Sequence, residues 1–218
     1  MKSNQSLVAG ALILVIASFI NRILGFVYKI LIVRLIGTEG VGLFQMVLPP
    51  FTLLLVLTTA GIPLSLSKLI AQKVAEGKRD EVNKIFLASL KILFLSSVII
   101  ASSGWYFAPR YINLLFSDPR VYWAYLTLIP ALIVVAFSSA YRGYFLGLKQ
   151  MFPSALSQVT EQIVRLTVGL ISATTFLPFG IEYATIGLAL GTVAGEIAGL
   201  LILIIFYQKN KPITILKK

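Results

Sequence analysis

Long apolar segments alternate with short polar stretches along the whole chain. Six segments stay apolar for about 20 residues or more, the length of helix that crosses the roughly 30 Å hydrocarbon core of a bilayer. They cover residues about 7–35, 41–60, 85–107, 121–141, 154–176 and 183–207. Because a spanning segment must satisfy its backbone hydrogen bonds internally, the pattern predicts an all-α protein, a polytopic membrane helix bundle with six transmembrane helices. We treat residues 1–218 as a single membrane domain.

A different kind of helix is predicted between the second and third segments. Residues 63–76 place apolar side chains at helical spacing on one side and polar or basic side chains on the other. A helix of this kind can lie at the membrane surface with its apolar face toward the lipid. The pattern therefore predicts an interfacial helix at 63–76, with Leu66, Leu69, Ile70 and Val74 opposite Lys68, Gln72 and Lys73.

The composition agrees with a membrane protein and changes how the charge is interpreted. Hydrophobic residues make up 58% of the chain and charged residues only 12%, yet the formal net charge is +11. Twelve basic residues fall on the side of the predicted bundle that holds both termini, and three fall on the other side. Since cytoplasmic loops carry the excess of Lys and Arg, both termini are predicted to be cytoplasmic, and no nucleic-acid partner is needed to explain the charge. The twelve are Lys2, Lys68, Lys73, Lys78, Arg79, Lys84, Arg142, Lys149, Lys209, Lys211, Lys217 and Lys218, and the three are Arg34, Arg110 and Arg120.

Fixed charge lies deep inside the first apolar segment. Arg22 follows an apolar run that starts at Leu7, which places it about two-thirds of the way across the bilayer. A cation at such a depth costs several kcal/mol unless it faces a cavity or a partner. We interpret Asn21, Arg22 and Lys29 as part of a wet cavity that binds substrate. The alternatives are a structural ion pair or snorkelling for Arg22, and an ordinary interface anchor for Lys29.

The fifth and sixth segments carry acids at membrane depth. Glu161 and Arg165 are four residues apart with the acid first, the favourable order for a helical ion pair. The pair is either a self-neutralised structural element or part of the cavity wall, with Glu161 as a coupling site. Glu196, in the sixth segment, is a second possible coupling acid, and its alternative is a structural partner among the nearby basic residues.

Two further patterns concern helix shape and packing. Pro49 and Pro50 lie within the second segment, where consecutive prolines remove backbone donors and predict a kink or hinge. Small residues recur every fourth position in the sixth segment, a spacing that lets two membrane helices approach closely and is more typical of packing than of ligand binding. They are Gly187, Gly191, Gly195 and Gly199.

The residue inventory limits the chemistry. The sequence contains no cysteine and no histidine, which removes thiol chemistry, the usual general base and most zinc and haem ligands. It also contains no phosphate-binding loop and no dinucleotide-binding glycine pattern. We therefore expect no enzymatic activity, no catalytic residue, no metal site and no cofactor.

Several blocks of sequence resemble one known family. They are SFINRILGFVYKILIVRLIGTEGVGLFQM from Ser18, GIPLSLSKLIA from Gly61, SSAYRGYFLGLKQM from Ser138, SQVTEQIVR from Ser157 and FLPFGIEYATIG from Phe176. In this order, over about residues 6–207, they resemble the stage V sporulation protein B and polysaccharide biosynthesis family. That family belongs to the polysaccharide-exporter and lipid II flippase branches of the multidrug/oligosaccharidyl-lipid/polysaccharide exporter superfamily.

The resemblance implies both an architecture and an activity. It implies two six-helix lobes around a central cavity in the bacterial cytoplasmic membrane, with this chain similar to the N-terminal lobe. The expected partners are therefore membrane lipids and either a second lobe or a second copy of the chain in a homodimer. The implied activity is flipping of an undecaprenyl-pyrophosphate-linked glycan by alternating access, in peptidoglycan or polysaccharide synthesis or in sporulation. Arg22 matches the first-span arginine of the lipid II flippases, whereas Tyr28 stands where they carry a second basic residue.

Two other functions fit the same pattern of residues. One is an ion-coupled exporter of drugs or cations on the same fold, in which Glu161 and Glu196 would do the work. The other is a membrane scaffold or lone lobe that transports nothing, whose charges inside the membrane only pair with one another.

Overall fold

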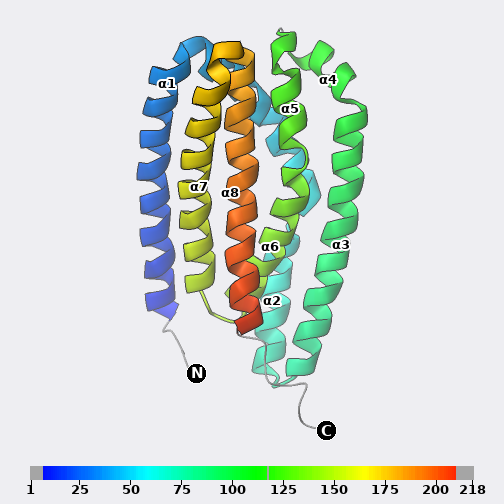
Figure 1. Ribbon diagram of the computed structural model, residues 1–218. Coiled ribbons are helices and arrows are strands. Elements are labelled where there is room, and N and C mark those ends of the chain that lie inside the picture. Colours follow the sequence, from blue (N-terminus) through cyan, green and yellow to red (C-terminus); the bar gives the residue numbers. More distant parts are fainter. Residues whose placement is uncertain (1–6, 117, 210–218) are drawn as a thin grey trace.

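The computed structural model describes residues 7–116 and 118–209, and within these residues the fold is all-α. The long helices run side by side along a common axis, as Figure 1 shows. The chain enters α1 at the same end of the bundle at which it leaves α8, and the turn between α2 and α3 lies at that end too. The sequence-based prediction of an all-α bundle is therefore confirmed. Lys2, Lys211, Lys217 and Lys218, which contributed to the predicted charge asymmetry, lie outside the described residues.

The first two apolar segments form one bent helix, α1 (Leu7–Thr59). Its 53 residues would measure about 80 Å as a straight helix, more than twice the roughly 30 Å core of a bilayer. The bend is at Gly37, whose φ of 71° and ψ of 179° lie in a region open almost only to glycine. Two arms result, one on each side of Gly37, and both can cross a membrane. The helix continues through Pro49 and Pro50, so the hinge at these prolines stays a prediction.

The predicted interfacial helix is part of the bundle. After a break at Ala60 and Gly61, which both have positive φ, α2 (Ile62–Ala75) runs beside α3 and α6. Its buried residues are Leu66 and Ile70, which belong to an apolar cluster with residues of α3 and α6. Leu69 and Val74, the other two apolar residues of the predicted pattern, are exposed, so a position of α2 at the membrane surface stays a prediction.

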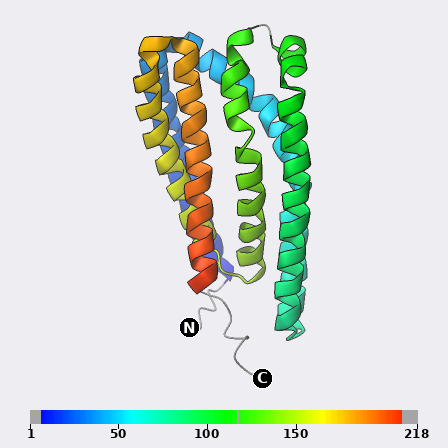
Figure 2. The ribbon, with the colours of Figure 1, turned by 45° about the vertical axis from the view of Figure 1, so that its right-hand side comes forward.

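The third and fourth segments also differ from their predicted bounds. The third is α3 (Arg79–Tyr106), followed by the short α4 (Ala108–Leu115) and the 3-10 turn η1 (Pro119–Val121). The fourth is divided into α5 (Tyr122–Leu128) and α6 (Ala131–Gly147), because Pro130 cannot donate a backbone hydrogen bond. Figure 2 shows α5 and α6 in line with each other, with α3 beside them. Helix α6 extends beyond residue 141, where the fourth apolar segment was predicted to end, so Arg142 lies within a helix.

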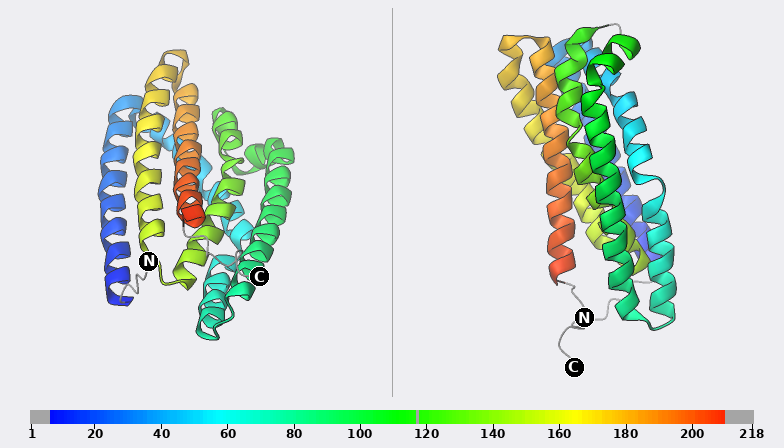
Figure 3. Two further views of the ribbon diagram at one scale, coloured as in Figure 1. Left: turned by 60° about the horizontal axis from the view of Figure 1, so that its bottom comes forward. Right: turned by 90° about the vertical axis from the view of Figure 1, so that its right-hand side faces the viewer.

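The last two segments form a tight helical hairpin. Helices α7 (Phe152–Phe176) and α8 (Ile181–Lys209) are joined by the 3-10 turn η2 (Leu177–Phe179). They lie next to each other, and the first arm of α1 lies beside α7, as the left-hand view in Figure 3 shows. Glycines of α8 make this approach possible: a side chain at Gly187 would come within 2.6 Å of the Ala173 backbone nitrogen.

Candidate functional site

The first arm of α1 carries the cationic residues predicted to line a cavity. Arg22 lies midway between Leu7, where α1 begins, and Gly37, where it bends, which is about 22 Å from either point. Its side chain is exposed and forms no ion pair with the residues that the structure describes. Lys29, two helical turns further on, is exposed on the same side of the helix and is also unpaired within the described ranges. The middle of this arm therefore presents two free cations.

The side of the arm that packs against α7 lies roughly a quarter-turn around the helix from these two cations. Tyr28 is buried, with its ring and hydroxyl against Gly169, where the absence of a side chain leaves room for it. Gly25 faces Gln162, and Asn21 is half-buried with an Oδ1 atom that has no hydrogen-bond partner among the described residues. Packing thus fixes the rotation of the helix, and that rotation leaves Arg22 and Lys29 outside the lobe.

A network of four charged side chains joins α6, α7 and α8. Glu161 accepts from Arg165 Nη2 at 2.6 Å through Oε1 and from Arg142 Nη2 at 2.7 Å through Oε2. Arg165 Nη2 also contacts Glu196 Oε1 at 3.0 Å. All four side chains are less than 30% exposed. Two positive and two negative charges therefore balance one another at membrane depth, and each acid has at least one arginine partner.

Arg142 is the member of this network that sequence analysis missed. The fourth segment loses its apolar character at Arg142 and Gly143, so the sequence places Arg142 just beyond the transmembrane segment. One signal was available: Ser138 and Arg142 are four residues apart and continue a polar line of the helix. Its partner Glu161 is on another helix, and that pairing cannot be seen in the sequence.

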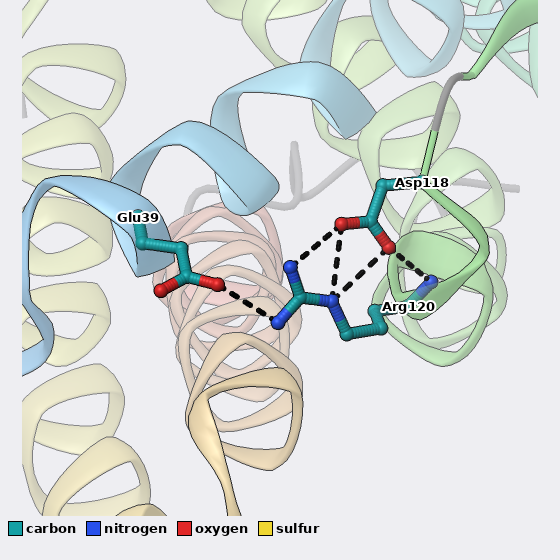
Figure 4. Close-up of polar contacts among 3 residues, drawn as sticks. All are labelled: Glu39, Asp118 and Arg120. Carbon is teal, nitrogen blue, oxygen red and sulfur yellow. Dashed lines mark hydrogen bonds and ion pairs between the residues drawn. The ribbon is translucent and has the colours of Figure 1, made fainter.

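A second charged cluster closes the other end of the bundle, near the bend of α1. Arg120 binds Asp118 at 2.7 Å and Glu39 at 2.8 Å, as Figure 4 shows. The arginine side chain and backbone N–H both donate to Asp118 and lower the pKa of its carboxyl below its ordinary value. Glu39 follows Gly37 closely, so this cluster ties the bend of α1 to the start of η1. Arg120 and Glu39 are exposed and Asp118 is partly exposed, which is typical of a polar cluster outside the bilayer.

Known proteins are similar to this chain in sequence and in fold. The sequence matches the family model described as polysaccharide biosynthesis protein over residues 7–218. Stage V sporulation protein B of Bacillus subtilis is 41% identical over 215 residues, which is 99% of this chain and 42% of that protein. Lipid II flippase MurJ of Bacillus subtilis is 31% identical over 222 residues, 95% of this chain and 40% of that protein. The chain thus spans about two fifths of the length of these curated relatives.

Solved transporter structures contain the same arrangement of helices. A multidrug resistance MATE family transporter of the MOP superfamily, in an outward-facing conformation, aligns with a TM-score of 0.73 at 17% identity, covering 91% of this chain and 45% of that one. A MOP superfamily transporter from Pyrococcus furiosus aligns with a TM-score of 0.69 at 16% identity, covering 89% and 44%. At these identities the likeness concerns the fold, and it covers somewhat less than half of each transporter chain.

Proposed function

The chain belongs to the polysaccharide biosynthesis protein family, and on that premise we propose that it is one helical lobe of a transporter for lipid-linked glycans. It is a multi-pass protein of a bacterial plasma membrane. The proposed cargo is a sugar or peptidoglycan precursor joined by a diphosphate to a polyprenyl chain. The similarity to lipid II flippase MurJ of Bacillus subtilis supports this class of cargo.

The observation that carries the proposal is the position of Arg22. An unpaired cation in the middle of a membrane-spanning arm is costly unless water or an anion reaches it. The alternative of a structural ion pair for Arg22 is not supported, since Arg22 forms no ion pair with the described residues, whereas Arg120, Arg142 and Arg165 do. A guanidinium group binds phosphate oxygens through two parallel N–H donors, so Arg22 suits a diphosphate, with Lys29 as a second cation.

The transport mechanism that fits this geometry needs a second half. A second lobe of the same polypeptide, or a second copy of this chain, would face the exposed side of α1 and enclose Arg22 in a cavity at the membrane midplane. The polyprenyl tail would stay in the lipid while the diphosphate and sugars occupy the cavity. Rocking of the two halves would then expose the cavity to each side in turn, with Pro49 and Pro50 as the proposed hinge.

The ion-coupled exporter remains a separate hypothesis with less support. Its working groups would be Glu161 and Glu196, and both of these acids are bonded to arginines. Loss of drug efflux in a Glu196→Gln variant would favour it. The scaffold hypothesis predicts instead that substitutions of Arg22 and Glu161 change the amount of protein in the membrane and nothing else.

The experiment that tests the proposal is a flipping assay in membrane vesicles with a fluorescent polyprenyl-diphosphate sugar. We expect Arg22→Ala to lose at least about tenfold in initial rate, because a charge-assisted bond to phosphate is removed. Arg22→Lys should keep part of the rate, since it retains the charge and loses the paired donors. Arg34→Ala, on the same arm near the bend, is the matched control and should flip normally. Normal flipping by Arg22→Ala at wild-type abundance would contradict the proposal.

A further inference from the structure

A cavity of about 280 Å³ opens between α1, α2, α6 and α7. Its residue on α1 is Leu14, which precedes Arg22 along that helix. Most of its lining is apolar and includes Leu14, Leu146 and Met151. Three polar side chains also line it, from α6 and the start of α7: Arg142, Ser154 and Gln158. This volume is near the small end of the range for ligand pockets, so it suits part of a larger molecule.

Two of the polar side chains have donors that the fold leaves unused. Ser154 is only 7% exposed, and its Oγ atom has no hydrogen-bond partner among the described residues. Arg142 uses Nη2 to bind Glu161, while its Nε atom is buried with no partner in the described part of the chain. Unsatisfied buried donors are costly, and a ligand that accepts hydrogen bonds would remove that cost. Arg142 is thus paired with Glu161 through Nη2, and its Nε–H is the donor that this pair leaves unused.

The position of the cavity along the bundle axis is nearer to one end of the bundle than the position of Arg22 is. Leu14 comes two turns after the start of α1, and Ser154 lies in the first turn of α7. Both helices start at the end of the bundle at which α8 finishes, the end predicted to be cytoplasmic. The cavity is therefore about two turns of helix, or roughly 12 Å, closer to that end than Arg22 is. A lipid-linked precursor made in the cytoplasm would meet this level of the membrane first.

We propose that this cavity is a loading subsite for a polyprenyl diphosphate, occupied before the cargo reaches Arg22. The inference rests on the proposed function. Arg142 and Ser154 donate to phosphate oxygens, and the apolar wall holds the first isoprene units of the tail. A guanidinium and a hydroxyl supply donors to a group that has only acceptors, which is the match that phosphate requires. The apolar lining in turn selects a phosphate that is attached to hydrocarbon.

Binding of three small probes to the detergent-purified chain tests the subsite. The probes are farnesyl diphosphate, inorganic diphosphate and farnesol, and the dissociation constants are measured by calorimetry. We expect farnesyl diphosphate to bind at least about tenfold more tightly than either of the others, because it alone satisfies both the donors and the apolar wall. Equal binding of inorganic diphosphate would identify a site for a free anion, and equal binding of farnesol would identify a plain apolar pocket; either result overturns the proposal.

Variants at the two donors complete the test. Arg142→Gln should weaken farnesyl diphosphate binding by about tenfold or more, and Ser154→Ala by about fivefold. Ser157→Ala is the matched control, because Ser157 is buried on the same helix but its Oγ already donates to the Ser154 carbonyl at 2.8 Å. It should bind within about twofold of wild type. Ser154→Ala leaves every ion pair of the network in place, so unchanged binding by this folded variant would overturn the proposal.

The same variants separate this inference from the proposed function. If Arg22→Ala stops flipping while Arg142→Gln and Ser154→Ala bind farnesyl diphosphate as well as wild type, the loading subsite is wrong and the transport function stands. If both donor variants lose binding while Arg22→Ala flips normally, the subsite stands as a binding site and the role of Arg22 in transport is wrong.

Discussion

At the scale of single residues, Arg165 links two acids that come from different helices. It lies between Glu161 on its own helix and Glu196 on α8, and so holds two acids that would otherwise repel each other. Removing one partner of a buried ion pair is far more costly than never having formed it, because the remaining charge stays buried without compensation. The network therefore stabilises one specific packing of α6, α7 and α8.

Substitution of Arg165 should reveal this role. We expect Arg165→Gln to lower the free energy of unfolding by about 3 kcal/mol, and the added change Glu196→Gln to restore part of that loss. The measurement is thermal or denaturant unfolding in detergent, followed by circular dichroism. Arg34→Gln, an exposed arginine on α1, should change stability little. A double variant as unstable as Arg165→Gln alone would show that the pairing with Glu196 contributes nothing.

At the scale of elements, the hairpin of α7 and α8 depends on space left by glycine. A side chain at Gly187 would come within 2.6 Å of the backbone of α7. A side chain at Gly42, in the second arm of α1, would meet nothing within 4 Å. We expect Gly187→Ala to destabilise the protein by about 1–3 kcal/mol through overpacking. Gly42→Ala should be neutral or stabilise it by up to about 1 kcal/mol, because alanine favours the helix.

Unfolding of both variants under the same conditions checks this prediction, since the substitution is identical and only its surroundings differ. Equal effects of the two substitutions would mean that helix propensity, rather than the contact between α7 and α8, decides stability at Gly187.

At the scale of the whole molecule, the orientation in the membrane can be measured directly. The sequence contains no cysteine, so single cysteines at opposite ends of the bundle are specific labels. Thr38 is exposed beside the bend of α1, and Lys78 is exposed at the turn between α2 and α3. With the basic excess in the cytoplasm, Thr38→Cys should react with an impermeant maleimide added outside intact cells.

The second label gives the opposite expectation. Lys78→Cys should react only after the membrane is permeabilised, and the cysteine-free parent should not react at all. The reverse pattern of labelling would place both termini outside and would move the cavity near Ser154 to the outer leaflet, where it could not load cargo from the cytoplasm.

The sequence predicted the features that depend on residues close together along the chain. Apolar length predicted the membrane bundle, and the spacing of Glu161 and Arg165 predicted an ion pair within one helix, because neighbours four residues apart meet whatever surrounds them. The depth of Arg22 followed from counting residues along one arm. Its role as the cation that binds substrate stays a prediction, as do the roles of Lys29 and the two proposed coupling acids.

Only the tertiary structure decided which faces meet. The pattern at 63–76 did not reveal that Leu66 and Ile70 pack against α3 and α6, because lipid and protein surfaces both bury apolar side chains. The pairing of Arg142 with Glu161 and of Arg165 with Glu196 joins different helices, and nothing in the spacing along one helix sets the rotation of its neighbour. The sequence by itself determined a membrane bundle with charges buried in it; three-dimensional packing decided that two of its arginines are neutralised within the lobe and that Arg22 is left free on its surface.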